Sequence, residues 1–247
     1  MTVPHARAEV ARARMIDLFP QGFEEVEHGD GVELVAYTDS RGEERLWQAF
    51  GQVSATAVEE GWEHRWRMFH RAVEVAGLWI GPPWESAPDG MQSIVIDPGR
   101  AFGTGSHPTT RLVLQLLSKV ERGSFLDVGC GSGVVAIAAG KLGFRPITAW
   151  DVERGAVEAT VRNAEANDVL LDVRHGDGTV VDFEPVDVCV ANVTLDVVER
   201  IVPRVRCRDL VTSGYLLSEA PRLSGYERLE RIGEEGWAAD LFRRAAQ

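Results

Sequence analysis

FLDVGCGSG, residues 125–133, runs from a short apolar strand through Asp127 into a loop with glycines at 129, 131 and 133. The residues that follow, Val134 to Lys141, are apolar and rich in alanine, which predicts a helix. A glycine loop between a strand and a helix N-terminus presents backbone N–H groups at the carboxyl end of a sheet. Glycine also lets a ligand approach the backbone closely. The stretch therefore predicts a ligand-binding turn in a parallel α/β sheet.

The spacing of these glycines selects among ligands. Nicotinamide-binding folds use G-x-G-x-x-G to admit a pyrophosphate. Here the third glycine comes one residue early, and Val134 stands where that pattern needs glycine. The spacing suits a ligand without a pyrophosphate, such as S-adenosylmethionine with its carboxylate, amine and sulfonium. It disfavours a nicotinamide oxidoreductase.

A second signal is Asp151, which follows an expected strand at 146–150. It lies 18 residues after Gly133, close to the ~20 expected for a carboxylate that binds both ribose hydroxyls. Asp is also a favoured helix N-cap, and a helix is expected directly after it. The register with the glycine loop favours the ribose.

Strands and helices alternate around this loop, which predicts a doubly wound, Rossmann-like α/β sheet over residues 91–247. The last two segments, 226–232 and 237–243, predict a terminal antiparallel hairpin. The expected strands are 93–96, 124–128, 146–150, 170–174, 187–191 and 209–214, and the expected helices are 108–119, 133–142, 153–166 and 195–204.

Residues 1–60 predict a separate small α+β unit. Its expected elements are a helix over 8–18, a hairpin of 23–27 and 32–37, a helix over 43–50 and a strand over 52–58. One more strand at the start would complete a ferredoxin-like fold. Thr2 to His5 is a poor candidate for that strand, so we expect an incomplete ferredoxin-like unit.

Residues 61–90 are expected to link the two parts. Residues 62–76 predict a helix rich in aromatic side chains, with Trp62 and Trp66 on one face because they lie one turn apart. Two turns rich in proline and glycine follow, at 81–84 and 87–90. We therefore place the domain boundary in this segment.

Composition narrows the classes of protein. The net charge is −12, which argues against a nucleic-acid binder because such a protein needs a basic face. Residues 1–60 hold 5 arginines against 12 acidic residues, a charge that would attract a basic protein partner, although an acidic solvated surface is the simpler interpretation. The three cysteines lack metal-ligand spacing, so we expect reduced thiols, no metal and a cytoplasmic protein. We expect no secretory signal and no membrane span.

A second glycine-rich run precedes the cofactor strand. Residues 97–110 read DPGRAFGTGSHPTT, and Pro108 with the two threonines starts a helix. A glycine loop at this place can close over a ligand as a lid, although an inter-domain linker is the alternative. His107 could accept a proton, and a hydrogen bond that orders the loop is the favoured role.

At these residues the sequence resembles the methyltransferase family that modifies ribosomal protein L-eleven (large-subunit ribosomal protein eleven). The resemblance covers residues 60–247 well and 1–60 in outline. Its most specific mark is the run from Asp97 to Thr110. The other matching segments are DVGCGSG at 127–133 with AIAA at 136–139 and KLG at 141–143, ANV at 191–193, SG at 213–214, and Trp62 to Trp84.

The resemblance implies a class I methyltransferase sheet that binds S-adenosylmethionine through Thr110, Gly129, Asp151 and Asn192, with Gly131 in the same loop. Independent reasoning supports Gly129, Asp151 and Asn192, since the last ends a buried strand at the sheet's carboxyl edge. Asp177 could accept a hydrogen bond from the adenine amino group, although GDG at 176–178 also suits a simple turn.

The implied reaction is N-methylation of lysine or N-terminal amino groups of ribosomal protein L-eleven, with Asn192 as the catalytic residue that aligns the amine. The sulfonium is a good leaving group, so the protein chiefly orients and desolvates. The alternative is a methyltransferase of this fold that acts on another protein or a small-molecule amine. A nucleic-acid amino-methyltransferase is disfavoured because neither prolines nor an aromatic residue follow Asn192. A non-catalytic binding module is disfavoured by the intact loop with Asp151 and Asn192.

Overall fold

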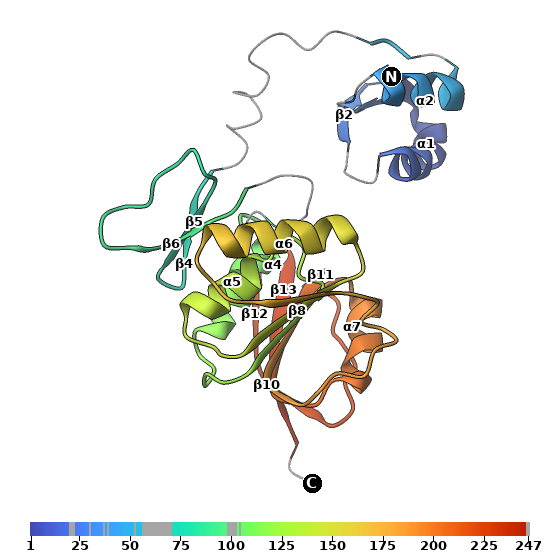
Figure 1. Cartoon of the computed structure of the whole chain (residues 1–247). Coiled ribbons are helices and arrows are strands. Elements are labelled where there is room, and N and C mark those ends of the chain that lie inside the picture. Colours follow the sequence, from blue (N-terminus) through green and yellow to red (C-terminus); the bar gives the residue numbers. More distant parts are fainter. Residues whose placement is uncertain are drawn as a thin grey trace. The chain divides into compact units, whose positions relative to one another are not determined.

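The computed structural model of the chain describes residues 1–19, 23–29, 31–36, 38, 40–51, 53–55, 71–97, 103 and 105–245 (Figure 1). Its contacts divide the chain into two compact units, Met1–Glu63 and His64–Gln247. None of the described helices is long and apolar enough to cross a membrane.

The larger unit is built on a seven-stranded sheet of order β12-β13-β11-β10-β7-β8-β9. The run from β11 to β9 is parallel, β13 is antiparallel to β11, and β12 is antiparallel to β13. This confirms the doubly wound sheet and the terminal hairpin. The strands are β7 (Phe125–Val128), β8 (Ile147–Asp151), β9 (Asp172–His175), β10 (Val186–Asn192), β11 (Cys207–Leu216), β12 (Tyr226–Glu234) and β13 (Trp237–Arg244).

Helices cover both faces of this sheet (Figure 1). Alternate side chains of β10 enter two separate cores: Val188 and Val190 pack with α4 and α5, whereas Cys189 and Ala191 pack with α7. Because both faces are buried, the strand is almost continuously apolar, as parallel strands usually are. The helices are α4 (Pro108–Leu117), α5 (Val134–Lys141), α6 (Arg154–Ala166) and α7 (Leu195–Ile201).

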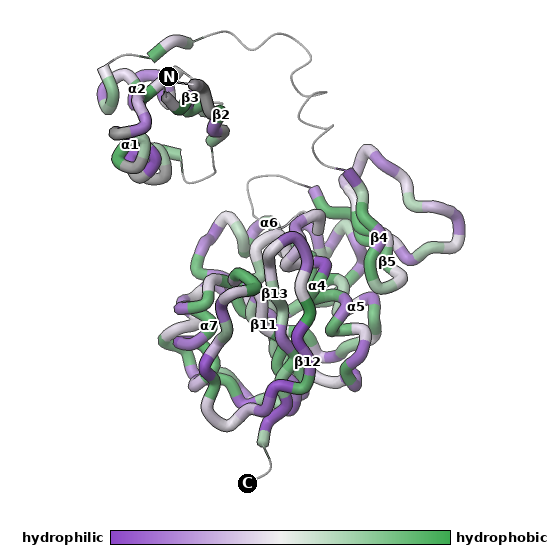
Figure 2. Tube along the Cα trace, turned by 180° about the vertical axis from the view of Figure 1, so that it is seen from behind, coloured by the Kyte–Doolittle hydropathy of each residue, from purple (hydrophilic) through white to green (hydrophobic). Residues whose placement is uncertain are grey.

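Helix α7 ends earlier than the expected 195–204. It stops at Ile201 and continues as a 3₁₀ turn, η1 (Val202–Arg204), that contains Pro203. Proline has no backbone N–H to donate to the helix, which favours a tighter and shorter ending. Figure 2 shows hydrophilic residues recurring along β12, as expected for a strand at the edge of the sheet.

Residues 73–95 form a second, three-stranded sheet. Its order is β4-β5-β6, with β4 (Val73–Val75), β5 (Leu78–Gly81) and β6 (Gln92–Val95). The expected strand 93–96 is present as β6, but it belongs to this sheet and not to the doubly wound one, and the other two strands were not predicted. The expected helix over 62–76 is wrong at its described residues, 71–76: residues 73–75 are strand β4, and a tight turn with positive φ at Ala76 (52°) and Gly77 (76°) joins β4 to β5. Positive φ at both central residues is typical of the two-residue turns that join the strands of a hairpin. Trp62 and Trp66 lie outside the described residues.

The smaller unit contains β1 (Thr2–Pro4), α1 (His5–Leu18), β2 (Glu24–His28), β3 (Gly31–Val35) and α2 (Ser40–Phe50), with sheet order β1-β3-β2. The expectation that the first strand is missing is wrong. Three residues with a proline give a weak strand signal, yet Met1 and Leu34 exchange backbone hydrogen bonds and Val3 pairs with Val32. Residues 53–55 of the expected last strand are not in a strand, and 52 and 56–58 lie outside the described residues.

Candidate functional site

A cavity of about 690 Å³ lies where the parallel strands of the larger sheet end. It is lined by residues that end or follow four strands: Gly129 after β7, Asp151 at the end of β8, Asp177 after β9 and Asn192 at the end of β10. Strand β7 lies between β8 and β10 in the sheet. The chain therefore continues to one side of β7 through β8 and β9, and to its other side through β10 and β11. Ligands of open α/β sheets bind at such a switch point.

The glycine loop after β7 shapes the cavity floor. Gly129 has φ +82°, and a Cβ there would lie 2.4 Å from Cγ1 of Val193, which follows β10. The N–H groups of Gly129 and Cys130 both donate to the Trp150 carbonyl, at 2.8 and 3.1 Å. Glycine is therefore required at 129 because the Val193 side chain lies where a Cβ would stand, and these two N–H groups are already engaged, which differs from the expectation of free donors.

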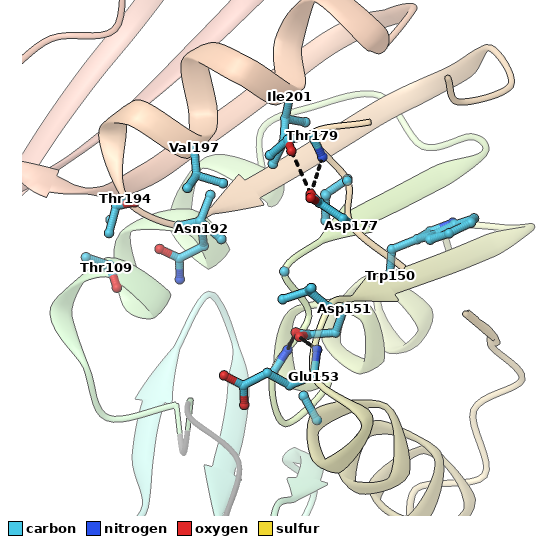
Figure 3. A pocket seen from close by; sticks show the side chains of 18 of the residues that line it. Thr109, Trp150, Asp151, Glu153, Asp177, Thr179, Asn192, Thr194, Val197 and Ile201 are labelled. Atoms are coloured by element: carbon cyan, nitrogen blue, oxygen red, sulfur yellow. Dashed lines mark hydrogen bonds between the residues drawn. The ribbon is translucent and has the colours of Figure 1, made fainter. Parts of the chain in front are cut away.

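Asp151 is fixed by two backbone N–H groups (Figure 3). Its Oδ2 accepts a hydrogen bond from Gly131 N at 2.9 Å, and its Oδ1 accepts one from Glu153 N at 2.9 Å. The N-cap of α6 is Glu153, so the interpretation of Asp151 as the capping residue is wrong. Asp151 holds the backbone just before α6 and lines the cavity. Each oxygen has a further lone pair with which to accept a ligand hydroxyl.

Asp177 lines the cavity from the turn after β9. Its Oδ1 accepts the N–H of Thr179 at 2.8 Å and the hydroxyl of Thr179 at 2.7 Å. The Thr179 hydroxyl, followed by the Thr179 backbone N–H, lowers the pKa of this carboxyl. Asp177 is therefore both the turn residue and a cavity residue, and the Oδ1 atom is engaged within the turn.

The other side of the cavity carries neutral polar groups. Figure 3 shows Thr109, Asn192 and Thr194 together, away from Asp151 and Asp177. Asn192 is held by the last pair of the β10–β11 ladder, opposite Ser213. A bulge follows in β11 at Gly214, whose φ is +99° and where a Cβ would lie only 2.2 Å from the Val193 carbonyl oxygen. This close approach brings the ends of β10 and β11 together in the wall.

The two threonines at the start of α4 have different surroundings. Thr109 lines the cavity, whereas Thr110 is 1% exposed and is absent from the lining. Consecutive helical residues point about 100° apart, so only one of the pair can face the same space. His107 Nδ1 accepts the N–H of Thr109 and lies 2.8 Å from the Thr109 hydroxyl. These hydrogen bonds fit the expected role of His107 in ordering the loop before α4.

Trp237 is a cavity residue that sequence reasoning missed. It begins β13, lines the cavity and meets the His107 ring edge-on, with centroids 5.0 Å apart and planes at 67°. No local motif predicts its role. The residue that it contacts, His107, lies more than a hundred residues earlier in the sequence. The contact exists only because β13 inserts beside β11.

Asp127 is a buried acid beneath the glycine loop. Its side chain is 1% exposed, and its Oδ2 has no hydrogen-bond partner among the described residues. Burial and then the nearby charge of Asp151 raise the pKa of this carboxyl to about 7, against a lowering by the Ala136 N–H. Among the described residues no group of three or more His, Cys, Asp or Glu side chains could hold a metal ion.

Strand order, the glycine loop after β7 and the acidic residue that ends β8 define the class of protein. A parallel sheet extended by an antiparallel β13 between β11 and β12 is the class I methyltransferase fold.

Comparison with known proteins gives the family. The family model described as Ribosomal protein L11 methyltransferase (PrmA) matches residues 19–221. A ribosomal protein L11 methyltransferase from Macrococcus caseolyticus is 36% identical over 210 residues, covering 77% of this chain and 68% of that protein. One from Thiobacillus denitrificans is 38% identical over 196 residues, covering 74% and 66%. The chain belongs to the ribosomal protein L11 methyltransferase family.

A solved structure supports the fold. The crystal structure of a ribosomal protein L11 methylase from Lactobacillus delbrueckii subsp. bulgaricus has a TM-score of 0.64 at 24% identity, covering 72% of this chain and all of that one. The chain spans only part of several relatives' lengths: its match to the Alkaliphilus metalliredigens methyltransferase covers 49% of that protein, at 37% identity over 60% of this chain.

Proposed function

We propose that this chain is an S-adenosylmethionine-dependent N-methyltransferase that acts on amino groups of ribosomal protein L11. The observation that carries the proposal is the two-sided cavity. A fixed carboxylate, Asp151, lies on one side, and the amide of Asn192 lies on the other (Figure 3). Membership of the family supplies the substrate, since the named relatives are methyltransferases of that ribosomal protein.

The residues present fit the cofactor. The volume, about 690 Å³, is within the ~300–1,000 Å³ of small-molecule sites. Asp151 lines the cavity and offers two oxygens to a pair of ribose hydroxyls. Asp177 and Gly131 line the same side. When bound, S-adenosylmethionine supplies a methyl group on a sulfonium that is already a good leaving group.

The protein's contribution is to orient the amine and exclude water. The carbonyl oxygen of Asn192 can accept a hydrogen bond from the amine and align its lone pair, and the Thr109 and Thr194 hydroxyls lie beside it. A lysine amine has an ordinary pKa of ~10.4, so it must lose a proton before it attacks. His107 Nδ1 is engaged with Thr109, so we assign the proton to water.

The charge of the chain is compatible with a basic protein as substrate. The chain carries 26 basic and 38 acidic residues, which favours encounter with a positively charged partner. The same charge disfavours direct binding of nucleic acid. An enzyme that modifies a ribosomal protein would act in the cytoplasm, where ribosomes assemble.

The test is transfer of labelled methyl from S-adenosylmethionine to purified L11, with the product mapped by mass spectrometry. Asn192→Ala is expected to abolish transfer, whereas Glu158→Gln, a change at an exposed ion pair on α6, is expected to leave it intact. Cofactor binding without transfer to L11 would reject the substrate and redirect the search to other proteins and small amines. Absence of cofactor binding would reject the enzyme itself.

A further inference from the structure

Arg111, in the first turns of α4, joins three parts of the larger unit. Its Nη1 donates to the Ser106 carbonyl, just before His107. Its Nε and Nη2 donate to Glu234 Oε1 at 3.1 and 2.8 Å, and Nη2 also donates to Glu235 Oε1 at 2.8 Å. Glu234 is the last residue of β12, and Glu235 begins the two-residue turn that leads into β13. Figure 2 shows α4 and β12 near each other in that view, and their residues are in contact.

The surroundings of this guanidinium distinguish it from a surface ion pair. The Arg111 side chain is 18% exposed, and its hydrogen bond with Glu234 raises its pKa. A partly buried guanidinium with several acceptors has a defined geometry, because its planar fork fixes the direction of each donor. Lys119 and Glu230 also join the end of α4 to β12, but their side chains are 48% and 35% exposed. Such exposed pairs contribute little.

The contacts of Arg111 lead to the cavity wall by two routes. The turn that it holds is followed, after Gly236, by Trp237, which lines the cavity. The carbonyl that it holds belongs to Ser106, next to His107, which caps α4 and contacts Thr109. The two routes meet where the Trp237 indole contacts the His107 ring. Arg111 itself is absent from the cavity lining.

We propose that Arg111 is a positioning residue that holds Trp237 against His107 and so fixes the wall on the side where Asn192 and Thr109 receive the acceptor amine. The proposal rests on the proposed function, because it assigns that side to the acceptor. Removal of the guanidinium would leave the carboxylates of Glu234 and Glu235 without their shared cation. The turn and Trp237 would then lose their fixed position relative to His107.

The effect is expected on the acceptor and not on the cofactor. Asp151 and the glycine loop are fixed by their own backbone hydrogen bonds, which do not involve Arg111. A displaced wall would loosen the alignment of the amine, and misplacement by about 1 Å can cost ~100-fold in rate.

The experiment compares Arg111→Met, Arg111→Lys and the matched control Lys119→Met in the full chain. Arg111→Met is expected to lower kcat/KM for L11 by about 10- to 100-fold, with an unchanged dissociation constant for S-adenosylmethionine. Arg111→Lys, which keeps the charge but not the planar fork, is expected to lie between. Lys119→Met is expected to match the wild type.

A readout without activity separates this proposal from the proposed function. The shift that the Trp237 ring imposes on the His107 ring protons is measured by NMR, with Trp237→Leu as the reference. Arg111→Met is expected to move the His107 signals toward that reference. It is also expected to raise the His107 pKa, because burial and then the Arg111 charge lower that pKa while Glu235 opposes them.

Two results would overturn the proposal. One is an unchanged His107 spectrum in Arg111→Met, and the other is an equal change of kcat/KM in Arg111→Met and Lys119→Met. A wild-type chain that binds the cofactor but does not methylate L11 would reject the proposed substrate, while the His107 spectrum would still decide whether Arg111 holds the wall.

Discussion

The two sides of the cavity are built in different ways. The side with Asp151 is built around the glycine loop and the next strand, which lie within about 25 residues of each other (127–153) and are joined by hydrogen bonds to the backbone. Asp177 is added to this side from the turn after β9. The side with Asn192 combines His107 and Thr109 before and in α4, Gly214 in β11 and Trp237 in β13. It therefore depends on strands that meet only in the folded sheet.

This difference explains why one side has a sequence signature and the other does not. A loop that closes on itself needs particular residues at fixed spacing, and the spacing is visible in the chain. A wall assembled across the sheet needs only residues that fit where they meet, and their separation in the sequence carries no regularity. Substitutions on the second side should therefore leave the geometry and cofactor affinity of the first side unchanged.

The largest effect is expected at Gly214, where the second side is most crowded. Gly214→Ala should destabilise the chain by roughly 2–5 kcal/mol, because the residue would keep a left-handed backbone and its Cβ would meet the Val193 carbonyl oxygen. Urea unfolding measures the change. Gly155→Ala, at an open position in α6, is the matched control and should stabilise by about 0.5–1 kcal/mol. Similar stabilities for the two variants would show that β11 can move away from Val193.

The next effect is expected at Asp151, on the first side. Asp151→Asn should weaken binding of S-adenosylmethionine by about 10- to 100-fold, since hydrogen bonds to a charged group contribute about 1.5–3 kcal/mol. Calorimetry measures the affinity. Asp172→Asn, at an exposed ion pair in β9, is the control and should bind normally. An Asp151→Asn variant with normal affinity would mean that the carboxylate only orders the start of α6.

A smaller effect is expected at Trp237, on the second side. Trp237→Leu should raise the KM for the protein acceptor about 10-fold by removing the ring that contacts His107, an effect within the range for misaligned reactants. The affinity for S-adenosylmethionine should stay the same, because Asp151 and its loop are joined independently. Steady-state kinetics with each substrate varied in turn give the two constants. Equal losses for cofactor and acceptor would contradict the independence of the two sides.

The smallest effect concerns pH and the buried Asp127. Its pKa is raised from 3.8 to about 7, so the folded state favours the protonated acid. The stabilisation that this carboxyl contributes is complete when the pH is below its pKa in the unfolded state. It is lost as the pH rises toward and through about 7, its pKa in the folded state. The loss between pH 6 and pH 8 should be about 1 kcal/mol. Unfolding midpoints across this range should show a flatter profile for Asp127→Asn, and identical profiles would exclude Asp127 as the cause.

The sequence by itself determined the parts that depend on local pattern. Alternating apolar strands and helices predicted the parallel sheet, and the strand–glycine–helix stretch at 125–133 located its switch point. Asp151 and Asn192 could be predicted because each ends a strand, and the carboxyl ends of parallel strands share one edge. The family resemblance rested above all on the run 97–110, together with 127–133 and 191–193, and residues 19–221 match the family model.

Only the tertiary structure decided the rest. Strands β1, β4 and β5 have three or four residues and no glycine loop and helix after them to mark their ends, so their pairing with neighbours defines them. The choice of Thr109 over Thr110 depends on how α4 is rotated against the sheet, which composition does not encode. Trp237 reaches the side with Asn192 from the start of β13, and Arg111 of α4 contacts the turn before it. Their positions follow from long-range packing, because contacts between distant segments form only when the whole sheet closes.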